Sequence, residues 1–199
     1  SNLRVALHRL RQQIADYLLI TQSSVTLNPA ATITLDIVHI ERYLAEGNLS
    51  EGTERYTSDF LADFYLDSSP AFEQWALLER ERLRTRVLSA FQQLIDRQAA
   101  ASQFAVATNA AQRLLQLDPL HEPTHRQLMR FLAQSGQRSA ALAQYETCRN
   151  LLNSELAVLP DETTTALAEL IRTGELERVT RWQGDTVTFT PEHSYTPSP

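Results

Sequence analysis

Residues 102–117 and 136–151 resemble one another at an offset of 34 residues. Polar turn residues and small packing residues recur in phase, at the pairs Ser102 and Gly136, Gln103 and Gln137, Ala107 and Ala141, Leu114 and Cys148, and Leu117 and Leu151. A period of 34 residues is typical of tetratricopeptide helix pairs. One such pair cannot bury its own apolar face, so stacked pairs share a core and leave a curved surface for a partner. The repeat predicts a helical interaction module that further helices cap.

The composition is that of a globular, helix-favouring chain. Of its 199 residues, 43% are hydrophobic and 21% charged, and only five are Gly, which suits one large domain or one domain plus part of another. The single Cys148 cannot form an internal disulfide, so we expect a buried free thiol in a reducing compartment. No run of 18 apolar residues and no signal peptide is present. We expect a soluble, cytoplasmic protein without a membrane segment.

The N-terminal region predicts a helix followed by a hairpin. Within residues 1–17, Leu3, Leu7, Leu10 and Ile14 recur at helical spacing, opposite a basic face. Two short β-prone runs, residues 18–21 and 25–28, then flank three polar residues and predict a small hairpin.

The rest of the chain reads as mostly helical up to Gly174. Apolar periodicity and Gly or Pro punctuation predict helices over residues 35–46, 70–101, 103–117, 123–135, 138–153 and 162–172. The charged residues at 79–86 are interpreted as a solvated ion-pair face. Residues 175–199 contain a short β-prone run at 186–190 and three Pro among Ser and Thr, which is typical of a linker.

One short motif imitates a metal site. The sequence from His121 to His125 fits the HExxH pattern of zinc peptidases, in which two His on one helix bind the metal and Glu activates water. Pro123, however, is tolerated only in a first helical turn. We therefore expect a helix that begins at about Pro123 and leaves His121 outside it, so that no metal is bound.

Other catalytic signatures are missing from the sequence, which has no Gly-rich phosphate loop, no GxSxG elbow and no ordered Cys and His pair. We expect neither an enzyme nor a cofactor. An enzyme that uses the HExxH motif remains the third interpretation.

Several stretches in order resemble a known family. Residues 60–65 (FLADFY), 72–75 (FEQW), 79–83 (ERERL), 117–122 (LDPLHE), 141–145 (ALAQY) and 160–164 (PDETT) are similar to the bacterial transcriptional activator domain of antibiotic-regulatory (SARP-type) activators. The resemblance covers about residues 35–171. It implies an all-α, tetratricopeptide-like helical-repeat module over residues 35–174.

In that family the module follows an OmpR-type winged-helix DNA-binding domain, and residues 1–34 resemble the last part of such a domain. Residues 3–11 are similar to its recognition helix and residues 18–28 to its wing hairpin. The earlier strands and helices of a winged helix are not in this sequence. Residues 175–199 resemble the linker to a further, downstream domain.

The resemblance implies that Arg4, His8, Arg9 and Arg11 face DNA, because Arg matches phosphate oxygens and the O6 and N7 acceptors of guanine. An ordinary solvated helix face is the competing interpretation. Residues 1–17 carry a formal charge of +2 and the remainder −8, so the helical module should bind protein rather than nucleic acid. The implied partners are promoter DNA and either RNA polymerase or a second copy. The alternative is a tetratricopeptide-type adaptor that does not bind DNA.

Overall fold

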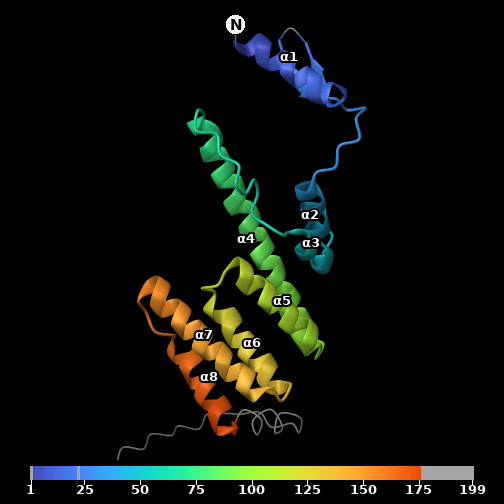
Figure 1. Ribbon diagram of the computed structural model, residues 1–199. Helices are drawn as coiled ribbons and strands as arrows, with labels where there is room; N and C mark the ends of the chain where they lie inside the picture. The colour runs from blue at the N-terminus through green and yellow to red at the C-terminus, as the bar shows by residue number, and fades with distance from the viewer. Residues whose placement is uncertain (1, 22, 176–199) are drawn as a thin grey trace, which may run out of the picture. The chain divides into compact units, whose positions relative to one another are not determined.

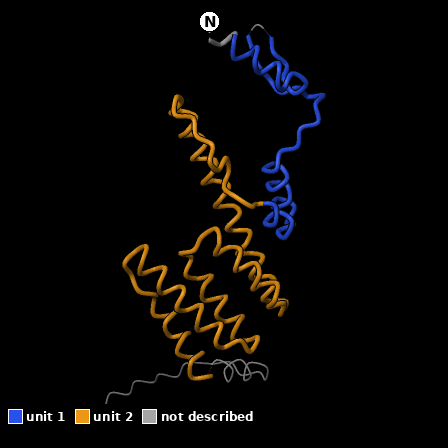
Figure 2. Tube along the Cα trace, in the orientation of Figure 1, with its two compact units in different colours: residues 1–55 blue, residues 56–199 orange. Residues whose placement is uncertain are grey.

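The computed structural model describes the backbone of residues 2–21 and 23–175 and, within these ranges, the side chains from Val5 onward. Figure 2 shows that the chain divides into two compact units, residues 1–55 and residues 56–199.

The first unit begins with α1 (Asn2–Ile14), which continues into a single turn of 3-10 helix, Ala15–Tyr17. The strands β1 (Leu18–Ile20) and β2 (Val25–Leu27) then pair antiparallel, with Leu18 opposite Leu27. The helix and hairpin predicted for this region are both confirmed.

Two short helices complete the first unit, α2 (Asp36–Ala45) and α3 (Leu49–Arg55). They contact each other closely at Gly52, where an added Cβ would lie 2.5 Å from Leu44 Cδ2. Since only Gly leaves room for this approach, Gly52 sets the spacing of the pair. α2 was predicted from the sequence, whereas α3 was not.

The second unit is a chain of packed helices: α4 (Pro70–Ala100), α5 (Phe104–Leu117), α6 (Glu122–Gln134), α7 (Arg138–Leu156) and α8 (Glu162–Thr173). Each packs against the next, and α6 also contacts α8 (Figure 1). α5 and α7 are the equivalent helices of the two similar segments, residues 102–117 and 136–151, which lie 34 residues apart in the sequence. The expected helices and the predicted all-α, helical-repeat class are confirmed.

Small residues let these helices approach one another. Ala107 and Ala111 on α5 and Ala141 on α7 are fully buried, and Met129, Leu167 and Ile171 fill the space between α6, α7 and α8. The close packing places Cys148 in the interior as a free thiol whose pKa burial raises to about 11.

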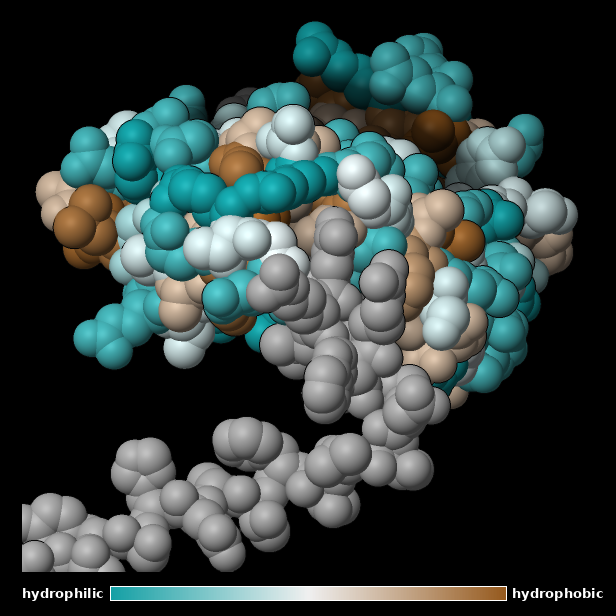
Figure 3. Space-filling model, turned by 90° about the horizontal axis from the view of Figure 1, so that it is seen from below, coloured by the Kyte–Doolittle hydropathy of each residue, from teal (hydrophilic) through white to brown (hydrophobic). Residues whose placement is uncertain are grey.

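On the face seen from below, hydrophilic residues cover most of the surface and hydrophobic ones form small separate patches (Figure 3).

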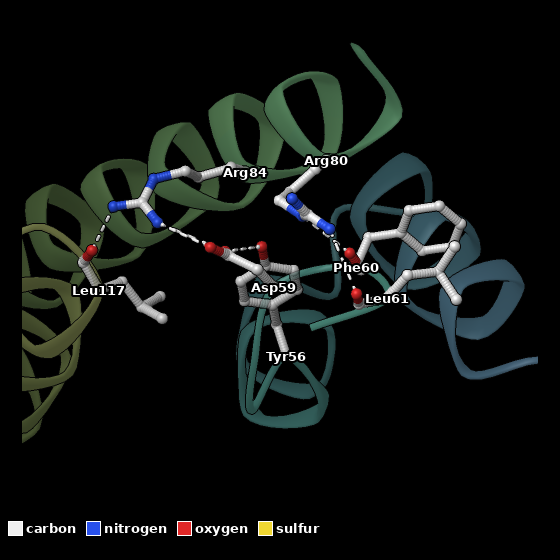
Figure 4. Close-up of polar contacts among 7 residues, drawn as sticks. All are labelled: Tyr56, Asp59, Phe60, Leu61, Arg80, Arg84 and Leu117. Atoms are coloured by element: carbon white, nitrogen blue, oxygen red, sulfur yellow. Dashed lines mark hydrogen bonds and ion pairs between the residues drawn. The ribbon is translucent and has the colours of Figure 1, made fainter. Parts of the chain in front are cut away.

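The segment between α3 and α4 is tied to the side of α4 (Figure 4). Arg80 donates from Nε to the carbonyl oxygen of Phe60 at 3.0 Å and from Nη2 to that of Leu61 at 3.2 Å. Arg84 donates to Asp59 Oδ2 at 3.2 Å and also to the carbonyl oxygen of Leu117, at the end of α5. Asp59 Oδ1 in turn accepts a bond of 2.7 Å from the Tyr56 hydroxyl.

These contacts correct one sequence interpretation. Arg80 and Arg84 are not part of a solvated ion-pair face, because both are half-buried and hold residues 59–61 and the end of α5 in place. Aromatic contacts strengthen the same attachment, since Phe60 packs edge-on against Trp75, with ring centroids 5.9 Å apart. The predicted linker and β-prone run at 175–199 lie outside the described residues, apart from Glu175.

Candidate nucleic-acid interface

All four residues predicted to face DNA, Arg4, His8, Arg9 and Arg11, belong to α1. Positions 4, 8 and 11 lie four and three residues apart, so they share one face of the helix. Arg9 is set about 100° round the helix axis from His8. The structure therefore groups three of the four positions and separates Arg9. His8, Arg9 and Arg11 are exposed, while the side chain of Arg4 lies outside the described ones.

Two of these side chains have contacts within the first unit. Arg11 donates from Nη2 to the carbonyl oxygen of Ile20 at 3.3 Å, which links α1 to β1. His8 Nε2 lies 3.2 Å from Gln12 Nε2, one turn further along the helix. Loss of Arg11 would thus disturb the hairpin as well as any contact with DNA. Arg9 is the residue that tests DNA contact most cleanly.

Asn28, directly after β2, is bonded to the 3-10 turn that follows α1. The Asn28 amide group donates from Nδ2 to the carbonyl oxygen of Asp16 at 2.8 Å, and the Asn28 backbone N–H donates to that of Tyr17 at 2.9 Å. The basic helix and the hairpin are therefore bonded together as one structural element.

The HExxH residues do not form a metal-binding arrangement. α6 begins at Glu122, so His121 precedes the helix, as the position of Pro123 predicted. His121 Nδ1 lies 2.7 Å from Thr124 Oγ1, a local contact at the start of the helix. Within residues 2–21 and 23–175, no cluster of three or more His, Cys, Asp or Glu side chains is placed to hold a metal ion.

His125 instead forms part of the packing between α6 and α7. Its Nε2 lies 2.8 Å from the carbonyl oxygen of Pro119, and its Nδ1 lies 2.6 Å from Gln144 Nε2. A carbonyl oxygen can only accept, so Nε2 carries the proton and Nδ1 accepts from Gln144. The ring is 2% exposed, and this burial lowers the pKa of His125. His125 is therefore a neutral imidazole with a fixed tautomer.

A pocket of about 220 Å³ opens beside this histidine. This pocket, the α5–α7 groove, is lined by helices α5, α6 and α7 and by the turn between α5 and α6. Its lining residues are Pro119 of that turn, the leucines Leu115, Leu128 and Leu151, the amides Gln112, Gln116 and Gln144, and Thr147 and His125.

The fold and these sites can be compared with known proteins. Residues 43–172 match the family described as "Bacterial transcriptional activator domain". The match runs from α2 to the last turns of α8 and covers well over half of the chain. The chain belongs to the bacterial transcriptional activator domain family. This is a family of transcription regulators rather than of enzymes, and the resemblance to SARP-type regulators is confirmed.

Among solved structures, the chain is similar to Mycobacterium tuberculosis EmbR in complex with a low-affinity phosphopeptide. The TM-score is 0.47 and the sequence identity 18%, over 92% of this chain and 55% of that chain. This chain thus corresponds to only about half of EmbR. No curated protein matches significantly. Among the described residues of this activator-domain protein, no helix is long and apolar enough to cross a membrane.

The α5–α7 groove of the activator domain was missed from the sequence. Its residues come from three helices and the turn between α5 and α6, and His125 and Gln144 stand 19 positions apart. The sequence repeat contained one indication of the groove: Leu117 and Leu151 occupy equivalent positions, and Leu151 lines the groove.

Proposed function

We infer that the chain is part of a bacterial transcription regulator that binds promoter DNA through its N-terminal region and protein through its helical module. Membership of the activator domain family is the observation that carries this proposal. In it, residues 1–34 belong to a winged helix, residues 35–174 form the activator module, and residues 175–199 link to a further domain. The protein acts in the cytoplasm.

The DNA-binding part rests on α1 and its charge. Arg4, His8, Arg9 and Arg11 would contact phosphates and base edges in the major groove, as a recognition helix does. The exposed basic helix supports this, and so does the contrast between a charge of +2 over residues 1–17 and −8 elsewhere. Leu10 and Ile14 remain 37% and 38% exposed, as expected of a helix whose apolar stripe packs on further structure.

The helical module would raise the occupancy of promoter sites by the regulator without catalysing any reaction. Two copies that touch through their modules bind repeated sites with additive contacts, because the second copy is held at a high effective concentration. A contact with RNA polymerase would recruit the polymerase to the promoter in the same way, by raising its effective concentration there.

The test is a selection of bound duplexes from fragmented genomic DNA, with the purified full-length protein at fixed, near-physiological salt. The variant Arg9→Ala and the triple Ala variant of Arg4, Arg9 and Arg11 should lose the enriched site. A matched triple Ala variant of the exposed module residues Arg130, Arg149 and Arg172 removes the same charge and should keep it.

The salt dependence of binding adds a second readout. For every phosphate that an α1 variant no longer neutralises, the slope of log affinity against log salt should become shallower by about 0.9. Enrichment that survives in the α1 variants would contradict the assignment of these residues. No enrichment with the wild-type protein would favour the adaptor without DNA binding.

A further inference from the structure

The N-terminal half of α4 and the segment before it expose large apolar side chains. Figure 1 shows α5 beside the C-terminal half of α4, and six of the seven buried residues of α4 lie in that half. In the other half Trp75 and Leu78 are 48% and 64% exposed, and in the preceding segment Phe64 and Tyr65 are 49% and 67% exposed. Soluble proteins rarely leave a contiguous surface of this kind uncovered unless it binds something.

The aromatic rings are already ordered. Phe72 packs against Phe64, with ring centroids 5.8 Å apart, and against Trp75 at 5.5 Å. Leu78 follows Trp75 by one helical turn and so extends the same surface. Below, Phe64, Phe72, Trp75 and Leu78 are called the α4 aromatic patch. Because its rings are held in place before any partner arrives, binding costs little conformational entropy.

Negative charge surrounds the patch. Residues 63–82 contain five carboxylates and two arginines, so their formal charge is −3. Both arginines are engaged within the module, Arg80 by the carbonyl oxygens of residues 60 and 61 (Figure 4) and Arg82 by Glu79 at 2.9 Å. Three of the carboxylates, Asp63, Asp67 and Glu81, are exposed beside the patch. The edge of the patch therefore attracts cations.

This combination selects the chemistry of the partner. A second copy would bring the same negative charges against its own, and nucleic acid would bring phosphates, so both are repelled. A protein segment that carries Arg or Lys beside a large apolar side chain fits both features. Its apolar side chain leaves water against the rings, and its cations pair with the carboxylates or lie over the faces of Trp75 and Tyr65.

We propose that the α4 aromatic patch is a protein-binding site of the module and takes a basic, amphipathic segment of a partner protein. Large apolar residues of that segment pack on Trp75 and Leu78, and its Arg or Lys residues face Asp63, Asp67 and Glu81. This inference rests on the proposed protein-binding role of the module and identifies the site and the chemistry of the partner.

The experiment presents a phage-displayed library of random dodecamer peptides to the full chain, without DNA. A synthetic peptide of the enriched sequence is then titrated by fluorescence anisotropy against the wild type and four variants. The first pair tests the apolar contact. Leu78→Ser removes an exposed leucine of the patch, and Leu159→Ser removes one that is 75% exposed between α7 and α8.

The second pair tests the charge. The double variant Asp67→Lys, Glu81→Lys reverses two charges beside the patch. The double variant Glu155→Lys, Glu175→Lys makes the same change at two exposed carboxylates elsewhere in the module. All four variants alter exposed side chains, and circular dichroism should show that they fold.

The expected consensus combines Arg or Lys with at least one large apolar residue. Its affinity should fall on the order of tenfold in Leu78→Ser and in the double variant at 67 and 81, and stay unchanged in both controls. A peptide with Glu in place of its basic residues should bind the double variant at 67 and 81 better than the wild type. A neutral or acidic consensus, affinity that neither patch variant lowers, or no enrichment would each overturn the proposal.

Sedimentation velocity tests the excluded occupant. A dimer of the wild type that Leu78→Ser dissociates, with Leu159→Ser still dimeric, would assign the patch to a second copy and overturn the proposal. The peptide titration contains no DNA and the duplex selection no peptide, so the two proposals fail separately. Enriched DNA without a basic peptide would leave the regulator and remove the patch as its protein-binding site, whereas a patch-bound peptide without enriched DNA would point to the adaptor.

Discussion

Ser102 and Gly136, which occupy equivalent positions of the 34-residue repeat, both adopt left-handed backbone conformations, with φ of 58° and 74°. Each ends a helix in the same way. The N–H of Ser102 donates to the carbonyl oxygen of Ala99, and that of Gly136 to Ala133, both at 2.9 Å. In each case the next residue donates across the helix end at 2.8 Å, which makes the two ends matched Schellman motifs. A seryl residue thus holds a conformation that favours Gly.

Ser102→Gly should therefore stabilise the second unit. A side chain in left-handed backbone costs roughly 1–2 kcal/mol, and the extra freedom of Gly in the unfolded chain offsets part of that gain. We expect the free energy of unfolding to rise by about 0.5–1 kcal/mol, as measured by urea denaturation.

The control is Ser135→Gly, one residue before Gly136, where φ is −84°. Here Gly relieves no strain, so the free energy of unfolding should fall or stay constant. A gain in Ser135→Gly equal to that in Ser102→Gly would contradict the explanation from backbone strain.

The helical elements could be predicted because their signals are local. The apolar stripes of α5, α6, α7 and α8 and the Gly and Pro residues between them lie within single segments. The helix α3 was missed because its seven residues carry almost no apolar periodicity and depend on the contact of Gly52 with α2. Tertiary packing outweighs local propensity in so short a helix.

The sites were less predictable because they join distant segments. Arg84 reads as one charge among many on α4, and only the folded chain brings it to Asp59, 25 residues away, and to Leu117, 33 residues away. The four positions on α1 could be named from the family resemblance. That Arg11 also binds the Ile20 carbonyl depends on the hairpin folding back.

Replacement of Arg84 should weaken the second unit more than loss of an exposed ion pair. Arg84→Lys keeps the charge, but one ammonium group cannot reach both Asp59 and the Leu117 carbonyl. Hydrogen bonds to charged groups contribute about 1.5–3 kcal/mol, so we expect a loss of roughly 1–2 kcal/mol, with guanidinium denaturation as the measurement.

Arg149→Lys is the matched substitution for that experiment. Arg149 pairs with Glu146 at 2.7 Å on α7, and both side chains are nearly half exposed. Exposed pairs contribute at most about 1 kcal/mol, so Arg149→Lys should change stability little. Equal losses in the two variants would argue against the role of Arg84 as a clamp.

Asp161 should make stability depend on pH in the acid range. It caps α8 by accepting the Thr164 backbone N–H at 2.7 Å and pairs with Arg126 Nη1 at 2.7 Å. Bonds from Thr163 and Thr164 and the charge of Arg126 hold the pKa of the Asp161 carboxyl at about 2, below its ordinary 3.8. A lowered acid pKa stabilises the fold above the unfolded pKa, so this contribution disappears as pH falls from about 4 to 2.

Two variants separate the cap from the charge. Asp161→Asn keeps a good N-cap and loses only the charged pair, whereas Asp161→Ala loses both and should cost about 1 kcal/mol at pH 7. Melting curves between pH 7 and 2 should show a shallower acid dependence in either variant than in the wild type. If the stability of Asp161→Asn fell with acidity as steeply as that of the wild type, Asp161 would not be a cause of the acid dependence.

His125 should make stability depend on pH nearer to neutrality, because it is a base that burial keeps neutral. Burial lowers its pKa from the ordinary 6.5, and the Pro119 carbonyl and Glu122 offset part of that effect. As pH falls below about 6.5 the unfolded chain takes up a proton that the native His125 refuses. Native stability therefore decreases with acidity, by at most about 1.4 kcal/mol per pH unit.

The measurement is the free energy of unfolding between pH 8 and 5 for wild type, His125→Gln and His8→Gln. His125→Gln should be less stable at pH 8, since the Pro119 carbonyl and Gln144 lose a well-placed partner, but its stability should vary less with pH. His8 is exposed, so His8→Gln should retain the wild-type slope. Equal slopes in wild type and His125→Gln would show that His125 already takes up a proton in the native state, and that the fixed neutral tautomer inferred from its two contacts is wrong.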